Sequence, residues 1–210
     1  DDAAAVGGVP DRATKVRERL ELWLATRGRR PSHIRMEREL VADLLYRFED
    51  ALRLGRLDLA EENLIKMEGS GSLSSENLSG LEFIYLAARG EWRDIWGKGA
   101  FDRLVEFGPP QRVGQAMLRA AYRCELQQYE DQSDPGEALS VYSGIVAPRC
   151  SPLLGKSQGL AFPETHMLRL LKEVTLPDAV WARIESAKAH ALKAGASERW
   201  LDALINAAET

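Results

Sequence analysis

Hydrophobic residues recur at helical spacing along most of the chain, and no stretch reads convincingly as a strand. The clearest helix runs from about Met36 to Gly55, and its hydrophobic face is wide enough to pack against two neighbours. The residues of that face are Met36, Leu40, Val41, Leu44, Leu45, Phe48, Ala51 and Leu52. Gly55 favours the left-handed conformation that ends a helix, so we expect the chain to turn there.

The segment after Gly55 predicts the elbow of a helical hairpin. Asp58 and Glu61 have the spacing of a capping box, in which the Asp side chain accepts backbone N–H groups and the Glu reaches back. We therefore expect the next helix to open at Asp58. A related elbow surrounds Gly90, which lies 35 residues after Gly55. Similar turns at about this spacing suggest stacked helix pairs.

Turn and capping residues divide the whole chain into about ten helices. Their predicted starts are residues 11, 36, 58, 74, 92, 111, 134, 163, 177 and 197. The start at Asp134 is a strong one, because Pro135 follows at the first helical position and Glu137 at the third. Pro148 is expected to end that helix.

These elements predict an all-α fold in which antiparallel helical hairpins stack as a short α-solenoid. We expect residues 1–10 to form a flexible lead-in and residues 11–148 to form the hairpins. Residues 149–161 contain a proline and two glycines without helical periodicity, which predicts an irregular loop that is either a module boundary or a binding loop. Residues 162–210 are expected to form C-terminal helices packed on the same domain.

Hydrophobic spacing also predicts which side chains of the later helices face the core. Among them are Ala88, Ile145, Trp200, Leu201, Leu204 and Ile205. Trp92 and Trp96 could form an exposed aromatic box for a ligand. At helical spacing directly after an elbow, however, such tryptophans are expected to pack in the core.

The elbows resemble those of tetratricopeptide-like helical repeats. Gly55, Leu57, Ala60 and Leu64 match the turn glycine, large residue, small residue and large residue of that family. The second copy, around Gly90, matches in part, and a third copy would lack the glycine. The resemblance covers about residues 36–147 and implies an α-solenoid that binds another protein in a concave groove.

A second resemblance extends from the elbows through Pro109 and Pro110 to Asp134. This order of helices and prolines is similar to helical segments within large bacterial phage-defence or DNA-modification proteins. It implies that the chain acts as part of a larger bacterial protein or complex.

Composition narrows the classes of function. The net charge of −4 gives no overall attraction to nucleic acid or to an anionic membrane, and no hydrophobic run approaches the length of a membrane span. The chain has two cysteines, Cys124 and Cys150, and no recognisable signal peptide, so a reduced, cytoplasmic setting is expected. The absence of an initiator Met is consistent with processing or with a piece of a larger protein.

The residues that carry catalytic chemistry show no recognisable pattern. His33, His166 and His190 are scattered, and none has a second His or Cys at metal-ligand spacing. Cys124 falls on a predicted core face with no histidine near it in sequence, which indicates a buried thiol and not a nucleophile. We therefore expect no catalytic residue, no metal and no cofactor.

Arginines gather in two places. Arg27, Arg29, Arg30 and Arg35 form the one local basic cluster, which is either a phosphate contact or a solvated connector between helices. The second set would form a stripe on one face of a helix, able to meet an acidic partner or simply face solvent. Its members are Arg112, Arg119 and Arg123.

Two classes of function remain in competition. The favoured one is a non-enzymatic scaffold that binds a protein partner or the remainder of a larger chain. The alternative is an accessory nucleic-acid-binding domain that uses the two arginine sets. An enzyme with a site built from distant residues is a third class that no motif supports.

Overall fold

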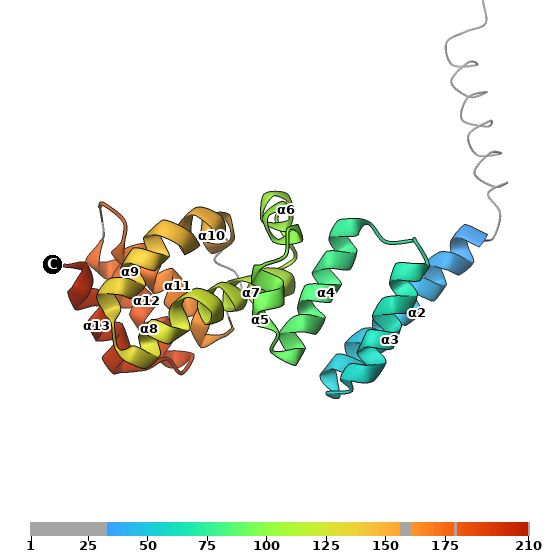
Figure 1. Ribbon diagram of the computed structural model, residues 1–210, viewed down its shortest axis with the longest axis horizontal. Coiled ribbons are helices and arrows are strands. Elements are labelled where there is room, and N and C mark those ends of the chain that lie inside the picture. The colour runs from blue at the N-terminus through green and yellow to red at the C-terminus, as the bar shows by residue number, and fades with distance from the viewer. Residues whose placement is uncertain (1–32, 156–160, 179, 210) are drawn as a thin grey trace, which may run out of the picture. The chain divides into compact units, whose positions relative to one another are not determined.

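The computed structural model of the protein describes residues 33–155, 161–178 and 180–209 (Figure 1). Every regular element in these residues is helical, which confirms the prediction of an all-α protein. The described helices number ten when two π-helical turns are counted within the helices that contain them. The predicted lead-in over 1–10 and the helix expected after residue 11 lie outside the described residues.

Backbone contacts divide the chain into two units, residues 1–43 and residues 44–210. The first unit contributes only the N-terminal turns of α2 (His33–Arg53) to the described residues. The second unit contains the rest of α2 and all later helices. Within the described ranges, no helix combines the length and the hydrophobicity that crossing a membrane requires.

A small hydrophobic core lies at the start of the second unit. It joins the C-terminal half of α2 to α3 (Leu57–Gly69) and α4 (Ser75–Arg89). Its buried members are Leu44, Phe48, Ala51, Ala60, Met67 and Tyr85. Those from α2 belong to the predicted hydrophobic face, whereas the side chains of Met36 and Leu40 lie outside the described part of the structure.

The ends of these helices follow the predicted glycine and serine signals, with one exception. Gly55 and Gly90 both have left-handed φ angles, +69° and +77°, where the chain leaves α2 and α4. Ser74 caps α4 by accepting a hydrogen bond from the backbone N–H of Asn77. The predicted capping box is wrong, because α3 begins at Leu57 and Asp58 lies inside its first turn. There the Asp58 carboxylate favours the helix through the dipole.

α4 packs on two sides. Tyr85 belongs to the small core, while Phe83 and Leu86 belong to a second, larger core that extends to the C-terminal helices. The buried stripe that includes Gly80 and Phe83 explains why Ala88, which was predicted to face inward, is exposed. α4 therefore links the first hairpin to the rest of the second unit.

Two short helices follow Gly90. α5 (Trp92–Trp96) and α6 (Ala100–Phe107) are separated by a break at Gly97 and Gly99. The side chain of Phe107 is 71% exposed. Phe107 lies about 120° around the helix from buried Phe101, so it cannot share that face.

The helix predicted to start at residue 111 runs continuously to residue 132 and contains a π-helical turn. It comprises α7 (Gln111–Ala121), the π-helical turn η1 (Tyr122–Leu126) and α8 (Gln127–Gln132). Its buried residues lie mainly in α7 and at the two ends of η1. A π-helical turn inserts a residue into the helical repeat, which sequence periodicity does not reveal.

The helix that begins at Asp134 also extends through a π-helical turn. Asp134 accepts a hydrogen bond from the Glu137 N–H (3.1 Å), which confirms the predicted cap of α9 (Pro135–Val141). The helix then continues through η2 (Tyr142–Val146) into α10 (Ala147–Leu154).

Three predictions about this helix are corrected. Pro148 does not end it, because proline is tolerated in the first turn of α10 after the π-helical turn. The irregular loop predicted over 149–161 is wrong for residues 149–154, which are helical, and residues 156–160 lie outside the described part. Ile145 is wrongly predicted to face inward, since it is 48% exposed. The π-helical turn η2 keeps Tyr142 and Val146 on the buried face and rotates Ile145 away from it.

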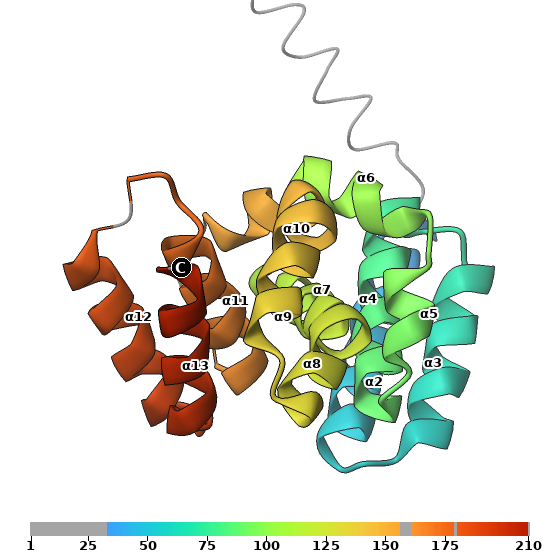
Figure 2. The same cartoon turned by 60° about the vertical axis from the view of Figure 1, so that its left-hand side comes forward.

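Three C-terminal helices complete the second unit. They are α11 (Pro163–Val174), α12 (Trp181–Lys193) and α13 (Glu198–Ala208). α13 packs against α9, α11 packs against α10, and α12 packs against α11 (Figure 2). α12 begins four residues later than Pro177 predicted. The predicted inward residues of α13 are all buried in the large core, namely Trp200, Leu201, Leu204 and Ile205.

Candidate protein-interaction groove

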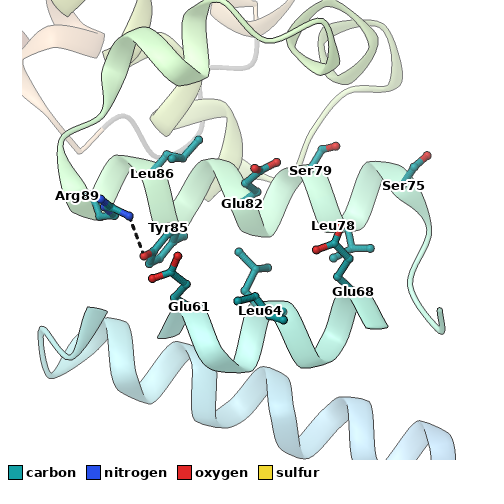
Figure 3. A pocket seen from close by; sticks show the side chains of 11 residues that line it. Glu61, Leu64, Glu68, Ser75, Leu78, Ser79, Glu82, Tyr85, Leu86 and Arg89 are labelled. Carbon is teal, nitrogen blue, oxygen red and sulfur yellow. Dashed lines mark hydrogen bonds between the residues drawn. The ribbon is translucent and has the colours of Figure 1, made fainter. Parts of the chain in front are cut away.

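A groove of about 470 Å³ runs between α3 and α4 (Figure 3). Hydrophobic side chains and charged side chains line it together. The lining residues are Glu61, Leu64, Ile65, Glu68, Ser75, Leu78, Ser79, Glu82, Tyr85, Leu86 and Arg89. A mixed surface of this kind is suited to binding a peptide or a helix of another protein.

Helical periodicity places these residues on facing stripes. On α3, Glu61, Leu64 and Glu68 recur at intervals of three and four residues, so they share one face. Figure 3 shows Leu64 between the two glutamates along that face. The opposing stripe of α4 has the same spacing over four turns, at positions 75, 78, 79, 82, 85, 86 and 89.

Two of the hydrophobic residues of the groove pack with the small core. Leu64 is half-buried and packs against that core, and Tyr85 is a member of it. Ile65 is instead 60% exposed. A partner could therefore contact Ile65 without any rearrangement of the small core.

The rim of the groove is predominantly acidic. Glu61, Glu68 and Glu82 line it, against a single arginine. Glu82 is already paired with Lys98 of the α5–α6 connection. The carboxylates of Glu61 and Glu68 are on exposed residues, and no described Lys or Arg forms a salt bridge with either.

The one arginine of the rim is held at an end of the groove. Arg89 donates a hydrogen bond to the Tyr85 hydroxyl (3.2 Å) and pairs with Glu91 (2.6 Å). Burial raises the pKa of the Tyr85 phenol, and the nearby Glu61 carboxylate adds to this shift. In Figure 3 Arg89 stands at one end of α4 with its guanidinium turned toward the Tyr85 hydroxyl and close to Glu61.

A second polar cluster lies in the large core, where Arg119 and Arg123 share one carboxylate. Glu164 is 5% exposed and accepts two hydrogen bonds from Arg123, from Nε (2.9 Å) and from NH2 (2.5 Å). Arg119 Nε lies 3.7 Å from the other Glu164 oxygen. Its guanidinium is stacked between the rings of Trp92 (4.7 Å) and Phe162 (4.1 Å). Burial lowers the pKa of Arg119, and Glu164 opposes that shift.

The predicted arginine stripe is therefore not a single basic surface. Arg119 and Arg123 meet at Glu164, whereas Arg112 lies 3.7 Å from the exposed Glu49 of α2. The expectation that the stripe simply faces solvent is wrong for Arg119, whose side chain is 22% exposed.

The side chains of the N-terminal arginine cluster lie outside the described part of the structure. Arg27, Arg29 and Arg30 lie outside the described residues. Arg35 belongs to α2, but its side chain is outside the described part. Their contact with nucleic acid or a partner stays a prediction.

The tryptophans after Gly90 are structural, as expected. Trp92 covers Arg119, and Trp96 packs edge-on against Phe101 with ring centroids 5.0 Å apart. Arg149 stacks over Trp96 at 4.2 Å and bonds to Asp102. The two tryptophans therefore make separate contacts, and Trp92 also lines a pocket of about 350 Å³ together with Arg93, Arg123 and Cys124.

The cysteines and two of the histidines can be placed in the described residues. Both cysteines are free thiols, and burial raises the pKa of Cys150 to about 12 and raises that of Cys124. His166 and His190, which are far apart in sequence, stack with ring centroids 6.1 Å apart. Within the described ranges no group of three or more His, Cys, Asp or Glu residues could hold a metal ion.

Sequence reasoning missed the residues that define both clusters. Glu164 and Phe162 were not singled out, because their arginine partner lies more than 40 residues away and helical periodicity carries no long-range pairing. The groove was missed for a similar reason. Glu61 was assigned to a cap, and the polar stripe of α4 was not compared with α3.

Comparison with known protein families places the chain. The DpdD-like family model matches residues 3–210, and no curated protein or solved structure matches the chain. DpdD is part of a DNA-modification and phage-defence system, in agreement with the resemblance drawn from the elbows and prolines. Because the match covers nearly the whole sequence, the chain belongs to the DpdD-like family.

Proposed function

We propose that the chain is a non-enzymatic interaction module of a bacterial DNA-modification and phage-defence system. It acts in the cytoplasm and binds another protein of that system through the α3–α4 groove. The groove carries this proposal, because it combines exposed hydrophobic surface with an excess of carboxylates on a helical hairpin. Membership of the DpdD-like family supports the biological setting.

We further propose that α2 to α5 are degenerate tetratricopeptide-like repeats. Three features support this. The elbow glycines Gly55 and Gly90 both have left-handed φ angles. Ala60, at the family's small position, is completely buried, and so is Ile95 after the second elbow. Repeats of this kind stack helix pairs and leave a surface for a partner.

The nucleic-acid alternative receives less support from the described arginines. Arg119 and Arg123 are engaged by Glu164, and Arg112 lies beside Glu49. A phosphate backbone requires several cations that are free to displace counterions. Contacts already made within the chain would have to be broken first.

Replacing Ile65 with glutamate tests the proposed partner site. We expect Ile65→Glu to reduce co-purification of the other proteins of the defence system by about tenfold, because a charge replaces an exposed hydrophobic contact. The measurement is quantitative mass spectrometry after affinity purification of the tagged chain from cells that express the complete system.

Ile145→Glu is the matched control. Ile145 is also an exposed isoleucine, 48% exposed against 60%, and lies on η2 outside the groove. It should leave co-purification unchanged, and both variants should keep the helical circular dichroism of the natural chain. Equal recovery with Ile65→Glu and with the natural chain would overturn the proposed function.

A further inference from the structure

We propose that the occupant of the α3–α4 groove is a basic amphipathic α-helix of the partner protein. This inference rests on the proposed function and adds the chemistry of the partner. It follows from three properties of the groove, which are its hydrophobic lining, the spacing of its carboxylates and its uncompensated charge.

The hydrophobic lining suits one face of a helix. Ile65 and Leu64 offer side chains from α3, and Leu78 offers one from α4. A volume of about 470 Å³ is small for a folded domain but can take a few hydrophobic side chains. A helix supplies such side chains in a row at intervals of three and four residues.

The spacing of the α3 carboxylates matches helical periodicity in the partner. Glu61 and Glu68 are seven residues apart on one face, which corresponds to a distance of about 10 Å along the helix. Lys or Arg side chains seven residues apart on a helix lying alongside α3 have the same separation. Both carboxylates could then be paired at once.

The charge that remains in the groove is negative. Lys98 engages Glu82, and Arg89 is directed to Tyr85 and Glu91. Neither Glu61 nor Glu68 forms a salt bridge among the described residues, and the electrostatic effect of Glu61 on Arg89 is weaker than that of Glu91. Complementary charge selects a basic helix over an acidic or neutral one and accelerates its encounter.

A pair of synthetic peptides provides the probe. The first is a fluorescein-labelled amphipathic helix of about 15 residues with Leu on one face and Lys on the other. The second has the same leucines, with Glu at every Lys position. Fluorescence anisotropy with the full chain should show the basic peptide binding about tenfold more tightly than the acidic one, with the preference shrinking as salt is added.

Charge reversal in the protein completes the test. The double variant Glu61→Lys with Glu68→Lys should weaken the basic peptide about tenfold and strengthen the acidic peptide. The control is Glu106→Lys with Glu185→Lys, which changes the net charge equally at exposed sites on α6 and α12. The control should leave the preference for the basic peptide unchanged.

Two results would overturn the inference. One is equal binding of the two peptides, and the other is the same loss of preference in the groove variant and in the control. Light scattering that shows a dimer dissociated by Ile65→Glu would also overturn it, because the occupant would then be a second copy. If the peptide test fails while Ile65→Glu still abolishes co-purification, the proposed function stands and only the basic helix is wrong.

Discussion

Replacing Ala60 with tryptophan is expected to destabilise the second unit by about 3 kcal/mol. Ala60 is completely buried in the small core, close to Phe48 and Met67. An indole at this position would have to push α2, α3 and α4 apart, because the interior is close-packed. The measurement is the melting temperature by circular dichroism, which should fall by about 6 to 12 °C.

Leu59→Trp controls for the introduction of tryptophan into α3. Leu59 precedes Ala60, is 38% exposed and belongs to neither hydrophobic core. This variant should change stability by no more than about 0.5 kcal/mol. An unchanged melting temperature for Ala60→Trp would contradict the close packing of Ala60 between α2, α3 and α4.

The second large effect is expected at Glu164. Changing Glu164 to glutamine keeps the shape of the side chain but removes the charge that faces Arg119 and Arg123. Loss of one partner from a buried ionic cluster costs about 3 to 5 kcal/mol, and the partial exposure of Arg123 reduces this to about 2 to 4 kcal/mol. Urea denaturation of the full chain measures the difference.

Glu62→Gln is the matched substitution at a surface pair. Glu62 and Lys66 are both more than half exposed, and a pair of this kind contributes less than about 1 kcal/mol. The free energy of unfolding should therefore change little in this variant. Equal effects of the two substitutions would show that Glu164 does not anchor α11 to α7.

Local backbone chemistry explains which parts of the fold were predictable. The turns at Gly55 and Gly90 and the caps at Ser74 and Asp134 depend on a few adjacent residues, so the sequence reveals them. The capping box at Asp58 failed because a cap depends on where the helix starts, and α3 starts one residue earlier.

Tertiary packing explains what was not predictable. The π-helical turns η1 and η2 shift the helical repeat by one residue, and no proline or glycine pattern announces them. Ile145 was placed inward for that reason. The cluster at Glu164 and the groove beside Glu61 both require knowing which helices are neighbours.

The proposed groove is tested most directly by photo-crosslinking in cells that express the complete defence system. Benzoylphenylalanine would be incorporated at Ile65 in one variant and at Ile145 in another, two exposed isoleucines of which only the first lines the groove. We predict that irradiation crosslinks position 65, and not position 145, to another protein of the system, identified by mass spectrometry. Absence of that product at position 65, or equal yields at the two positions, would contradict a partner site between α3 and α4.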